Sequence, residues 1–297
     1  MLSKNKIIRV CQLGFLGLQL SDRPQLYKIG LKISNKCNFN CHYCNARIYR
    51  SRPENIGHEM QSKDAERILE EAWNIGCRFS SFGGLIGEVS MHSYFYHILQ
   101  TAKRMGYIVN FTTNGWNIDP ARLSMLEPVD RIRISIDKMH LEGSPDPLAY
   151  VNRLSSIIEE CINQKLSIHI VSHEESTREI DKMLDKIEVN VYNYPLITCH
   201  STPHQCGKKN IFRCINPWTS ISIDSHLMVN PCSCSSECVG SIRDGIKLTD
   251  IWFGEDLMAF RKMMASSNTP PICLSCDRSC RDLYQWWKAA YNNKSMI

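Results

Sequence analysis

The sequence predicts an α/β fold built on a parallel β-sheet. Short apolar runs alternate with longer amphipathic stretches between residues 27 and 194. The runs are apolar almost throughout, which is typical of parallel strands buried on both faces. With 297 residues, 43% of them hydrophobic, the chain can bury the core of one large domain, or of a large and a small one. We expect strands at 27–34, 78–82, 107–112, 131–137, 166–172 and 189–194.

Helices are predicted between these strands from hydrophobic stripes at helical spacing. The first begins at Ser62, a residue type that caps helices, and ends near Gly76. Alternation of strand and helix implies right-handed crossovers, which place the strands parallel in one sheet with the functional edge at their carboxyl ends. The other stripes lie at 93–105, 120–126, 148–162 and 176–187.

Three cysteines follow the first predicted strand at a spacing typical of metal ligands. Cys37, Cys41 and Cys44 form a C-x3-C-x2-C sequence. Thiolates this close together suit a soft metal ion or an iron–sulfur cluster, and a closed site of either kind needs four ligands. One position is therefore left open for another molecule, which indicates catalysis. A zinc knuckle completed by a distant residue and three unconnected buried cysteines are the alternatives.

Polar residues follow the next three predicted strands. Gly87 and Glu88 come after the second strand, Asn114 after the third, and Ser135 and Asp137 at the end of the fourth. A glycine lets the backbone approach a ligand, and a carboxylate binds an ammonium group by a charge-assisted hydrogen bond. A turn at Asn114 and a helix cap at Asp137 are equally consistent with the sequence.

A second group of cysteines lies in the C-terminal third. Alternation over 217–231 predicts a β-hairpin that turns at 224–226 and brings Cys214 and Cys232 together. One helix is expected over 248–264, and a C-x2-C pair, Cys273 and Cys276, follows it. The expected buried stripe of that helix is Ile251, Trp252, Met258, Phe260 and Met263.

The first cysteine motif resembles that of the radical S-adenosylmethionine (SAM) enzymes. Tyr43 is part of the match, because these enzymes usually carry an aromatic residue directly before the third cysteine. The resemblance implies a partial (β/α)6 TIM-like barrel. It also implies that Cys37, Cys41 and Cys44 bind three irons of a [4Fe–4S] cluster whose fourth iron chelates SAM, with Tyr43 near the cluster and the adenine.

The resemblance extends to the strand ends. The segment 82–92 is similar to the family's G-E-P-L-L-H sequence, with Val89 in place of the proline. This similarity implies that Gly87 and Glu88 bind the methionyl group of SAM. It further implies that Ser135 hydrogen-bonds the ribose and that Asn114 lies at the barrel mouth, in contact with the cofactor or in a turn.

The C-terminal layout resembles the auxiliary-cluster domains of these enzymes, called SPASM in the two-cluster form and twitch in the one-cluster form. The resemblance implies one auxiliary [4Fe–4S] cluster bound by Cys214, Cys232, Cys273 and Cys276. A structural zinc ion on the same thiolates is the alternative. We expect three parts in the chain, an N-terminal extension at 1–26, the radical SAM barrel at 27–195 and the auxiliary-cluster domain at 196–297.

Three cysteines in this region are surplus to one cluster. Cys234, Cys238 and Cys280 are candidates for ligands of a second cluster, for a thiol that donates a hydrogen atom to a substrate radical, or for spare thiols. Together with Asp137 they are the candidate catalytic residues, and the sequence does not choose among them.

Charge and composition limit the partners. A net charge of +5 without a long basic run argues against a nucleic-acid partner and leaves small anionic substrates open. Fifteen cysteines, an odd number grouped like metal ligands, indicate a reducing cytoplasm. The apolar segment 7–20 is too short to span a bilayer and lacks a signal-cleavage pattern, so no membrane association is expected.

The resemblance implies the chemistry of the reaction. A reductant such as flavodoxin or ferredoxin supplies one electron, SAM is cleaved, and the 5′-deoxyadenosyl radical removes a hydrogen atom from the substrate. Few residues precede the first strand, so we expect no leader-binding module and therefore a small substrate, a sugar- or aminocyclitol-like compound that is oxidised or epimerised. Oxidation, epimerisation or crosslinking of a peptide is the second possibility, and a zinc-binding interaction module is the alternative of another class.

Overall fold

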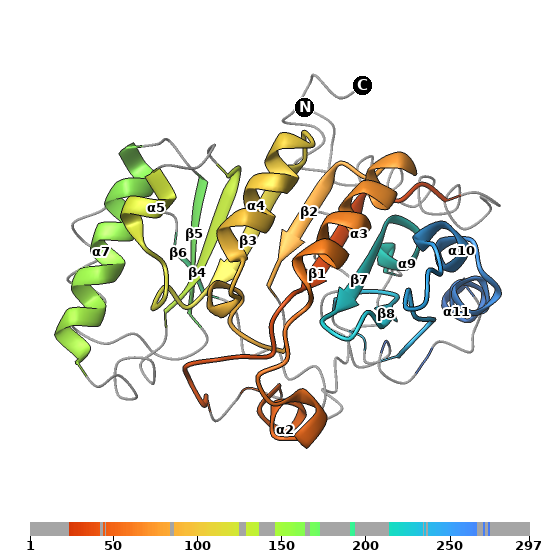
Figure 1. The fold of residues 1–297 in the computed structure, drawn as a ribbon, viewed down its shortest axis with the longest axis horizontal. Helices are drawn as coiled ribbons and strands as arrows, with labels where there is room; N and C mark the ends of the chain where they lie inside the picture. Colours follow the sequence, from red (N-terminus) through yellow and green to blue (C-terminus); the bar gives the residue numbers. More distant parts are fainter. Residues whose placement is uncertain are drawn as a thin grey trace, which may run out of the picture.

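One sheet runs through the whole computed structural model, from the first described strand to the C-terminal hairpin (Figure 1). None of the described helices is long and apolar enough to cross a membrane. The structure describes residues 24–41, 44, 46–83, 86–124, 129–136, 146–163, 167–172, 191–193, 214–233, 235, 237–265, 270 and 273. The helix expected at 176–187 and most of the expected extension at 1–26 lie outside these residues.

The sheet has eight strands in the order β6-β5-β4-β3-β2-β1-β7-β8. All neighbours are parallel except β7 and β8, so the predicted α/β architecture with a parallel sheet is confirmed. The strands are β1 (Lys28–Lys32), β2 (Phe79–Phe82), β3 (Ile108–Thr113), β4 (Arg131–Ser135), β5 (Ser167–Ser172), β6 (Val191–Asn193), β7 (Ser220–Asp224) and β8 (Val229–Asn230).

Helices α3, α4, α5 and α7 lie along one face of the sheet (Figure 1). The predicted stripe of α3 faces inward, with Ile68 and Leu69 fully buried. The Tyr107 hydroxyl donates to the carbonyl of Leu69 at 2.6 Å and so fixes α3 to the start of β3. The described helices are α2 (Ala46–Arg50), α3 (Ser62–Asn74), α4 (Phe95–Arg104), α5 (Pro120–Ser124), α7 (Pro147–Asn163), α9 (Asn216–Thr219), α10 (Leu248–Trp252) and α11 (Glu255–Ala265), with 3-10 turns η1 (Pro53–Asn55) and η2 (Val89–Met91).

The opposite face of the central strands, here called the inner face, is polar. Side chains alternate along a strand, so the buried Leu31, Phe82 and Ile132 mark the helix side. The positions between them carry almost no aliphatic side chain, although parallel barrels usually fill this space with branched residues. At these positions from β7 to β4 stand Ser220, Ser222, Asp224, Lys28, Gly30, Lys32, Phe79, Ser81, Ile108, Asn110, Thr112, Arg131, Arg133 and Ser135, with the apolar Phe79 and Ile108 at the amino-terminal ends of β2 and β3.

The C-terminal hairpin extends the barrel sheet. β7 pairs in parallel with β1 along its full length, placing Ile221 beside Ile29, and β8 returns antiparallel to β7. The sequence predicts the hairpin but not its partner strand. The chain turns over 225–228, where Leu227 takes a left-handed conformation (φ 64°).

The prediction of a single helix over 248–264 is wrong, because two helices, α10 and α11, occupy this segment. Gly254 separates them, and a side chain there would overlap the carbonyl oxygen of Asp250. The break rotates α11 relative to the predicted stripe. Met263 is consequently 40% exposed, whereas Leu257 and Met264 are buried.

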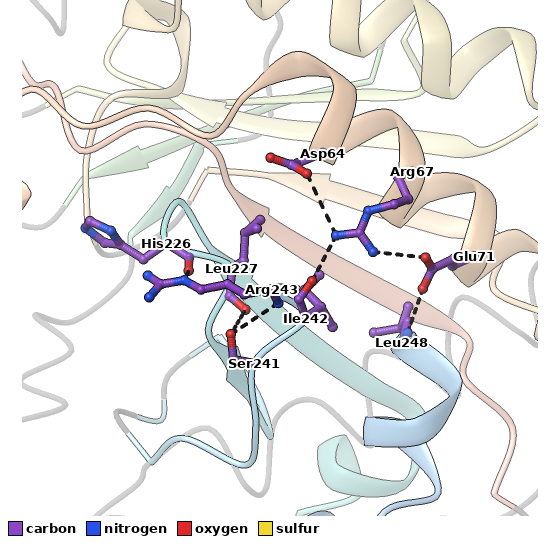
Figure 2. Close-up of polar contacts among 9 residues, drawn as sticks. All are labelled: Asp64, Arg67, Glu71, His226, Leu227, Ser241, Ile242, Arg243 and Leu248. Atoms are coloured by element: carbon purple, nitrogen blue, oxygen red, sulfur yellow. Dashed lines mark hydrogen bonds and ion pairs between the residues drawn. The ribbon is translucent and has the colours of Figure 1, made fainter. Parts of the chain in front are cut away.

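An ion pair on α3 fastens the barrel to the C-terminal region (Figure 2). Arg67 pairs with Glu71 at 3.0 Å and with Asp64 at 3.8 Å, and it donates to the carbonyl of Ile242 at 3.0 Å. The second oxygen of Glu71 accepts the backbone N–H of Leu248 at 2.6 Å. Leu248 is the first residue of α10, and the N-cap residue Lys247 makes no side-chain hydrogen bond to the helix. Glu71 of α3 therefore provides the carboxylate that caps the N-terminus of α10.

Two histidine rings stack at the interface between the barrel and the C-terminal region. His58 and His226 lie with ring centroids 3.8 Å apart and 20° between planes, joining the loop before α3 to the β7–β8 turn. His226 Nε2 lies 2.8 Å from Asn55 Oδ1, and Ser225 donates to Asn35 Oδ1 at 3.0 Å. Burial lowers the pKa of His58 below its ordinary value, and the neighbouring His226 lowers it further.

Replacing Glu71 by alanine should lower the free energy of unfolding by about 1–2 kcal/mol, because it removes both a helix cap and the ion-pair partner of Arg67. Urea unfolding of the holoprotein measures this change. Glu70→Ala on the exposed side of α3 is the matched control and should change stability by less than about 0.5 kcal/mol. Equal losses in the two variants would contradict the role of Glu71.

Stability should fall as the pH drops below 6.5, the ordinary pKa of histidine. The folded state holds the pKa of His58 below that value, so the unfolded chain binds the proton first and is favoured by acid. Asp224 and Glu59 raise this pKa and Arg243 lowers it, but burial and His226 outweigh the carboxylates. The His58→Phe variant keeps a stacked ring and should show a smaller loss of unfolding free energy between pH 7.5 and pH 5.5. Identical pH dependence in both proteins would contradict this assignment.

Candidate active site

The three predicted cluster cysteines lie on the loop that leaves the carboxyl end of β1. Cys41 is buried, Cys37 and Cys44 are half-buried, and the Cys44 amide donates to the Cys41 carbonyl at 3.0 Å. Arg50 of α2 places Nη1 3.9 Å from the Cys44 sulfur and donates from Nη2 to the Phe39 carbonyl at 3.3 Å. A guanidinium beside a thiol favours the thiolate, which is the form that binds metal. Burial raises the pKa of the Cys37 thiol, with the Phe39 amide and Arg50 opposing it.

Gly87 brings the loop after β2 against the cysteine loop. A side chain at this position would overlap the carbonyl oxygen of Ser34 and would lie 2.8 Å from that of Lys36. The next amide, from Glu88, donates to the Lys36 carbonyl at 2.8 Å. The backbone of this segment therefore touches the chain one residue before Cys37, as the glycine in the sequence predicts.

Glu88 is 5% exposed and joins three segments through its carboxylate. Oε1 accepts from the Ser90 amide at 3.1 Å, the Ser90 hydroxyl at 2.6 Å and the Thr113 hydroxyl at 2.6 Å. Among the described residues, Oε2 accepts only the Asn114 amide, at 2.8 Å, which leaves it a lone pair for a further donor. Burial raises the pKa of Glu88, and these four hydrogen bonds lower it.

Asn114 connects the end of β3 to the cysteine loop. Its Nδ2 donates to Asn38 Oδ1 at 2.9 Å, and its Oδ1 accepts the Trp116 amide at 2.9 Å, so it forms the turn considered from the sequence. Beside it, Phe39 packs edge-on against Trp116, with ring centroids 6.1 Å apart, and in a tilted arrangement against Tyr150, with ring centroids 5.9 Å apart. The cysteine loop is thus held by one amide pair and one aromatic cluster.

The structure brings together four of the predicted elements, namely the cysteine loop, Gly87, Glu88 and Asn114. Ser135 is half-exposed at the carboxyl end of β4, on the inner face. Tyr43 and Asp137 lie outside the described residues, so their roles remain predictions. The sequence analysis missed Asn38 and Arg50, and the only signal was their nearness to the cysteines.

The C-terminal cysteines lie on separate short segments. Cys214 is half-buried and accepts the Asn216 amide on its sulfur at 3.4 Å, a contact that stabilises thiolates in iron–sulfur sites. Cys232 follows β8 and Cys273 follows α11, both half-buried. Cys238 is exposed and donates from its thiol to the Gly240 carbonyl at 3.2 Å. Cys234, Cys276 and Cys280 lie outside the described residues.

The donor sets suit iron–sulfur clusters. Three thiols lie on one loop, next to the Arg50 guanidinium and to the close backbone contact at Gly87. Three thiolates match a cluster that leaves one iron free for a ligand. Among the described residues, no three Cys, His, Asp or Glu side chains converge on the position of a single metal ion. The assignment of these cysteines to iron–sulfur clusters consequently rests on the chemistry of the thiols and on the position of the first group at the carboxyl edge of the sheet.

A parallel sheet with an open-ended thiol site at its carboxyl edge fits an iron–sulfur enzyme. Residues 31–198 match the Radical SAM superfamily, and residues 214–277 match the SPASM iron-sulfur cluster-binding domain. The chain belongs to the radical SAM superfamily. It therefore uses a [4Fe–4S] cluster and SAM, and its SPASM domain carries an auxiliary cluster.

Two solved structures share this fold over most of the chain. BtrN in complex with AdoMet and 2-DOIA is 14% identical, with a TM-score of 0.56 over 86% of this chain and 94% of that one. SuiB of Streptococcus suis bound to the precursor peptide SuiA is 15% identical, with a TM-score of 0.53 over 90% of this chain and 73% of that one. At these identities the likeness shows the TIM-like barrel fold alone.

Replacing Gly87 by alanine should displace the cysteine loop, because the added methyl group meets backbone that cannot rotate away. We expect a loss of about 1–3 kcal/mol in unfolding free energy and fewer irons bound after anaerobic reconstitution. Gly57→Ala is the control, since its methyl group meets open space and only the left-handed backbone (φ 65°) opposes it. That variant should keep its iron, and an unchanged iron content in Gly87→Ala would contradict the close packing.

Proposed function

We propose that the protein is a radical SAM dehydrogenase or epimerase acting on a small sugar- or aminocyclitol-like molecule. The polar inner face is the observation that carries this proposal. Except for Phe79 and Ile108 at the amino-terminal ends of β2 and β3, hydroxyl, amide and charged side chains line the positions from β7 to β4 where a packed barrel has aliphatic ones. Such a surface suits a substrate rich in hydrogen-bonding groups, because buried polar groups need partners.

The chain's own residues bind and orient the reactants. Cys37, Cys41 and Cys44 would hold the [4Fe–4S] cluster, which when reduced would supply the electron for cleavage of SAM to a hydrogen-abstracting radical. Gly87 and Oε2 of Glu88 would hold the methionyl ammonium, and Ser135 the ribose. Asn114 keeps the cysteine loop in place through Asn38.

The auxiliary site supports oxidation as the net reaction. An auxiliary cluster on Cys214, Cys232, Cys273 and Cys276 could accept the second electron after hydrogen abstraction, which completes a two-electron oxidation. Epimerisation would need a hydrogen-atom donor instead, and the exposed thiol of Cys238 is the candidate among the described cysteines. The fifteen cysteines, an odd number grouped like metal ligands, support a reducing cytoplasm as the location.

Peptide modification is the second candidate function. A structural neighbour was crystallised with its precursor peptide, and the polar inner face would also accept a peptide backbone. A zinc-binding interaction module does not account for the match to the radical SAM superfamily.

Iron and sulfide analysis with Mössbauer spectra tests the two-cluster assignment. The wild type, reconstituted without oxygen, should hold about eight irons, and the variant Cys37→Ala, Cys41→Ala, Cys44→Ala about four as one cubane. The variant should also lose the formation of 5′-deoxyadenosine from SAM. If it loses all iron instead, the C-terminal cysteines hold no cluster, and net oxidation through an auxiliary cluster is wrong.

A further inference from the structure

A cationic and apolar surface projects beside the cysteine loop. It consists of Arg47, Ile48, Arg52 and Ile56, and we call it the α2 surface. Ile48 is 68% exposed and Ile56 69%, and both arginines are exposed. Figure 1 shows α2 standing apart from the sheet and from the helices that cover it. Exposed apolar side chains ringed by charge are typical of sites where another protein binds.

The α2 surface is mechanically tied to the cluster cysteines. The amide of Arg47 donates to the Cys44 carbonyl at 3.0 Å, so α2 begins directly on the loop. Arg50, on the same helix, reaches back to the Cys44 sulfur and the Phe39 carbonyl. A molecule bound to the α2 surface would therefore lie next to the first cluster, whereas the substrate would lie over the inner face of the sheet.

The charge on this surface is not neutralised within the described chain. Arg47 and Arg52 make no ion pair with any described acidic residue, and the Arg52 guanidinium lies 6.0 Å above the ring of Tyr49. Glu54 is the only acidic residue in the segment 46–57, which also holds Arg50. Three arginines against one glutamate leave a net charge of +2 on twelve residues.

We propose that the α2 surface is the docking site of an acidic one-electron carrier protein that reduces the first cluster. The inference rests on the proposed function, because it requires a redox-active cluster at Cys37, Cys41 and Cys44. The reduced carrier loses one electron and the cluster gains it, so no further co-reactant is needed. Electron-transfer complexes are small and brief, and complementary charge speeds their formation.

Charge favours such a carrier over a second copy of the chain. Two copies would bring like-charged surfaces together, and the whole chain carries a net charge of +5. An acidic partner pairs with both arginines while Ile48 and Ile56 supply the apolar centre of the contact.

The test compares the double variant Arg47→Glu, Arg52→Glu with a control that carries the same charge change elsewhere. Lys247 and Lys262 are exposed residues of the C-terminal region, so Lys247→Glu, Lys262→Glu is the matched control. Anaerobic stopped-flow absorbance follows reduction of the first cluster by reduced flavodoxin, an acidic carrier. Reduced methyl viologen, a small cation that needs no docking site, is the second reductant.

The rate with flavodoxin should fall at least about tenfold in the α2 variant at low ionic strength and should approach the wild-type rate at high salt. The control should keep its flavodoxin rate, and methyl viologen should reduce all three proteins equally fast. An unchanged flavodoxin rate in the α2 variant would overturn the proposal, as would an equal loss with methyl viologen, which indicates a damaged loop.

Binding of oxidised flavodoxin, measured by calorimetry, gives a readout that does not depend on turnover, and it should weaken in the α2 variant alone. Sedimentation tests whether a second copy of the chain binds the α2 surface instead. If the wild type is a dimer and the α2 substitutions dissociate it, this surface is a dimer interface and the proposal is overturned. Failure of methyl viologen to reduce the wild type would instead count against the proposed function itself.

Discussion

Gly87 lies so close to the backbone of residues 34–36 that no side chain fits between them. This contact sets the distance between the loops that leave β1 and β2, and hence the position of the three cysteines over the sheet. Glu88, the next residue, uses its buried carboxylate to add the end of β3 through Thr113 and Asn114. The carboxyl ends of three strands are therefore held in one arrangement by a glycine and a carboxylate that adjoin in sequence.

The C-terminal region depends on the same sheet. β7 occupies the edge of β1, so the cysteines before and after the hairpin are positioned by the strand that also leads to the first cysteine loop. Glu71 and the His58–His226 stack fasten this region at two further points. The pairing with β1 and these separate contacts fix the two cysteine groups relative to each other.

The two sides of the first cluster differ in character. The inner face presents mostly polar side chains, and the α2 surface presents arginines and isoleucines to solvent. Arg50, the last residue of α2, links this helix to the cysteine loop through its contact with the Cys44 sulfur. This asymmetry would let a reductant approach from outside while the substrate stays among hydrogen-bonding groups.

The sequence alone determined the parallel α/β architecture, the described strands and the first cysteine motif. Strand periodicity and ligand spacing are local properties, so Cys37, Cys41, Cys44, Gly87 and Glu88 could be recognised without a structure. Only the tertiary structure decided that β7 joins β1, that Arg67 reaches Ile242 across 175 residues, and that Asn38 pairs with Asn114. Those contacts depend on which surfaces meet when the sheet forms. A polar side chain on one element carries no local signal of its distant partner.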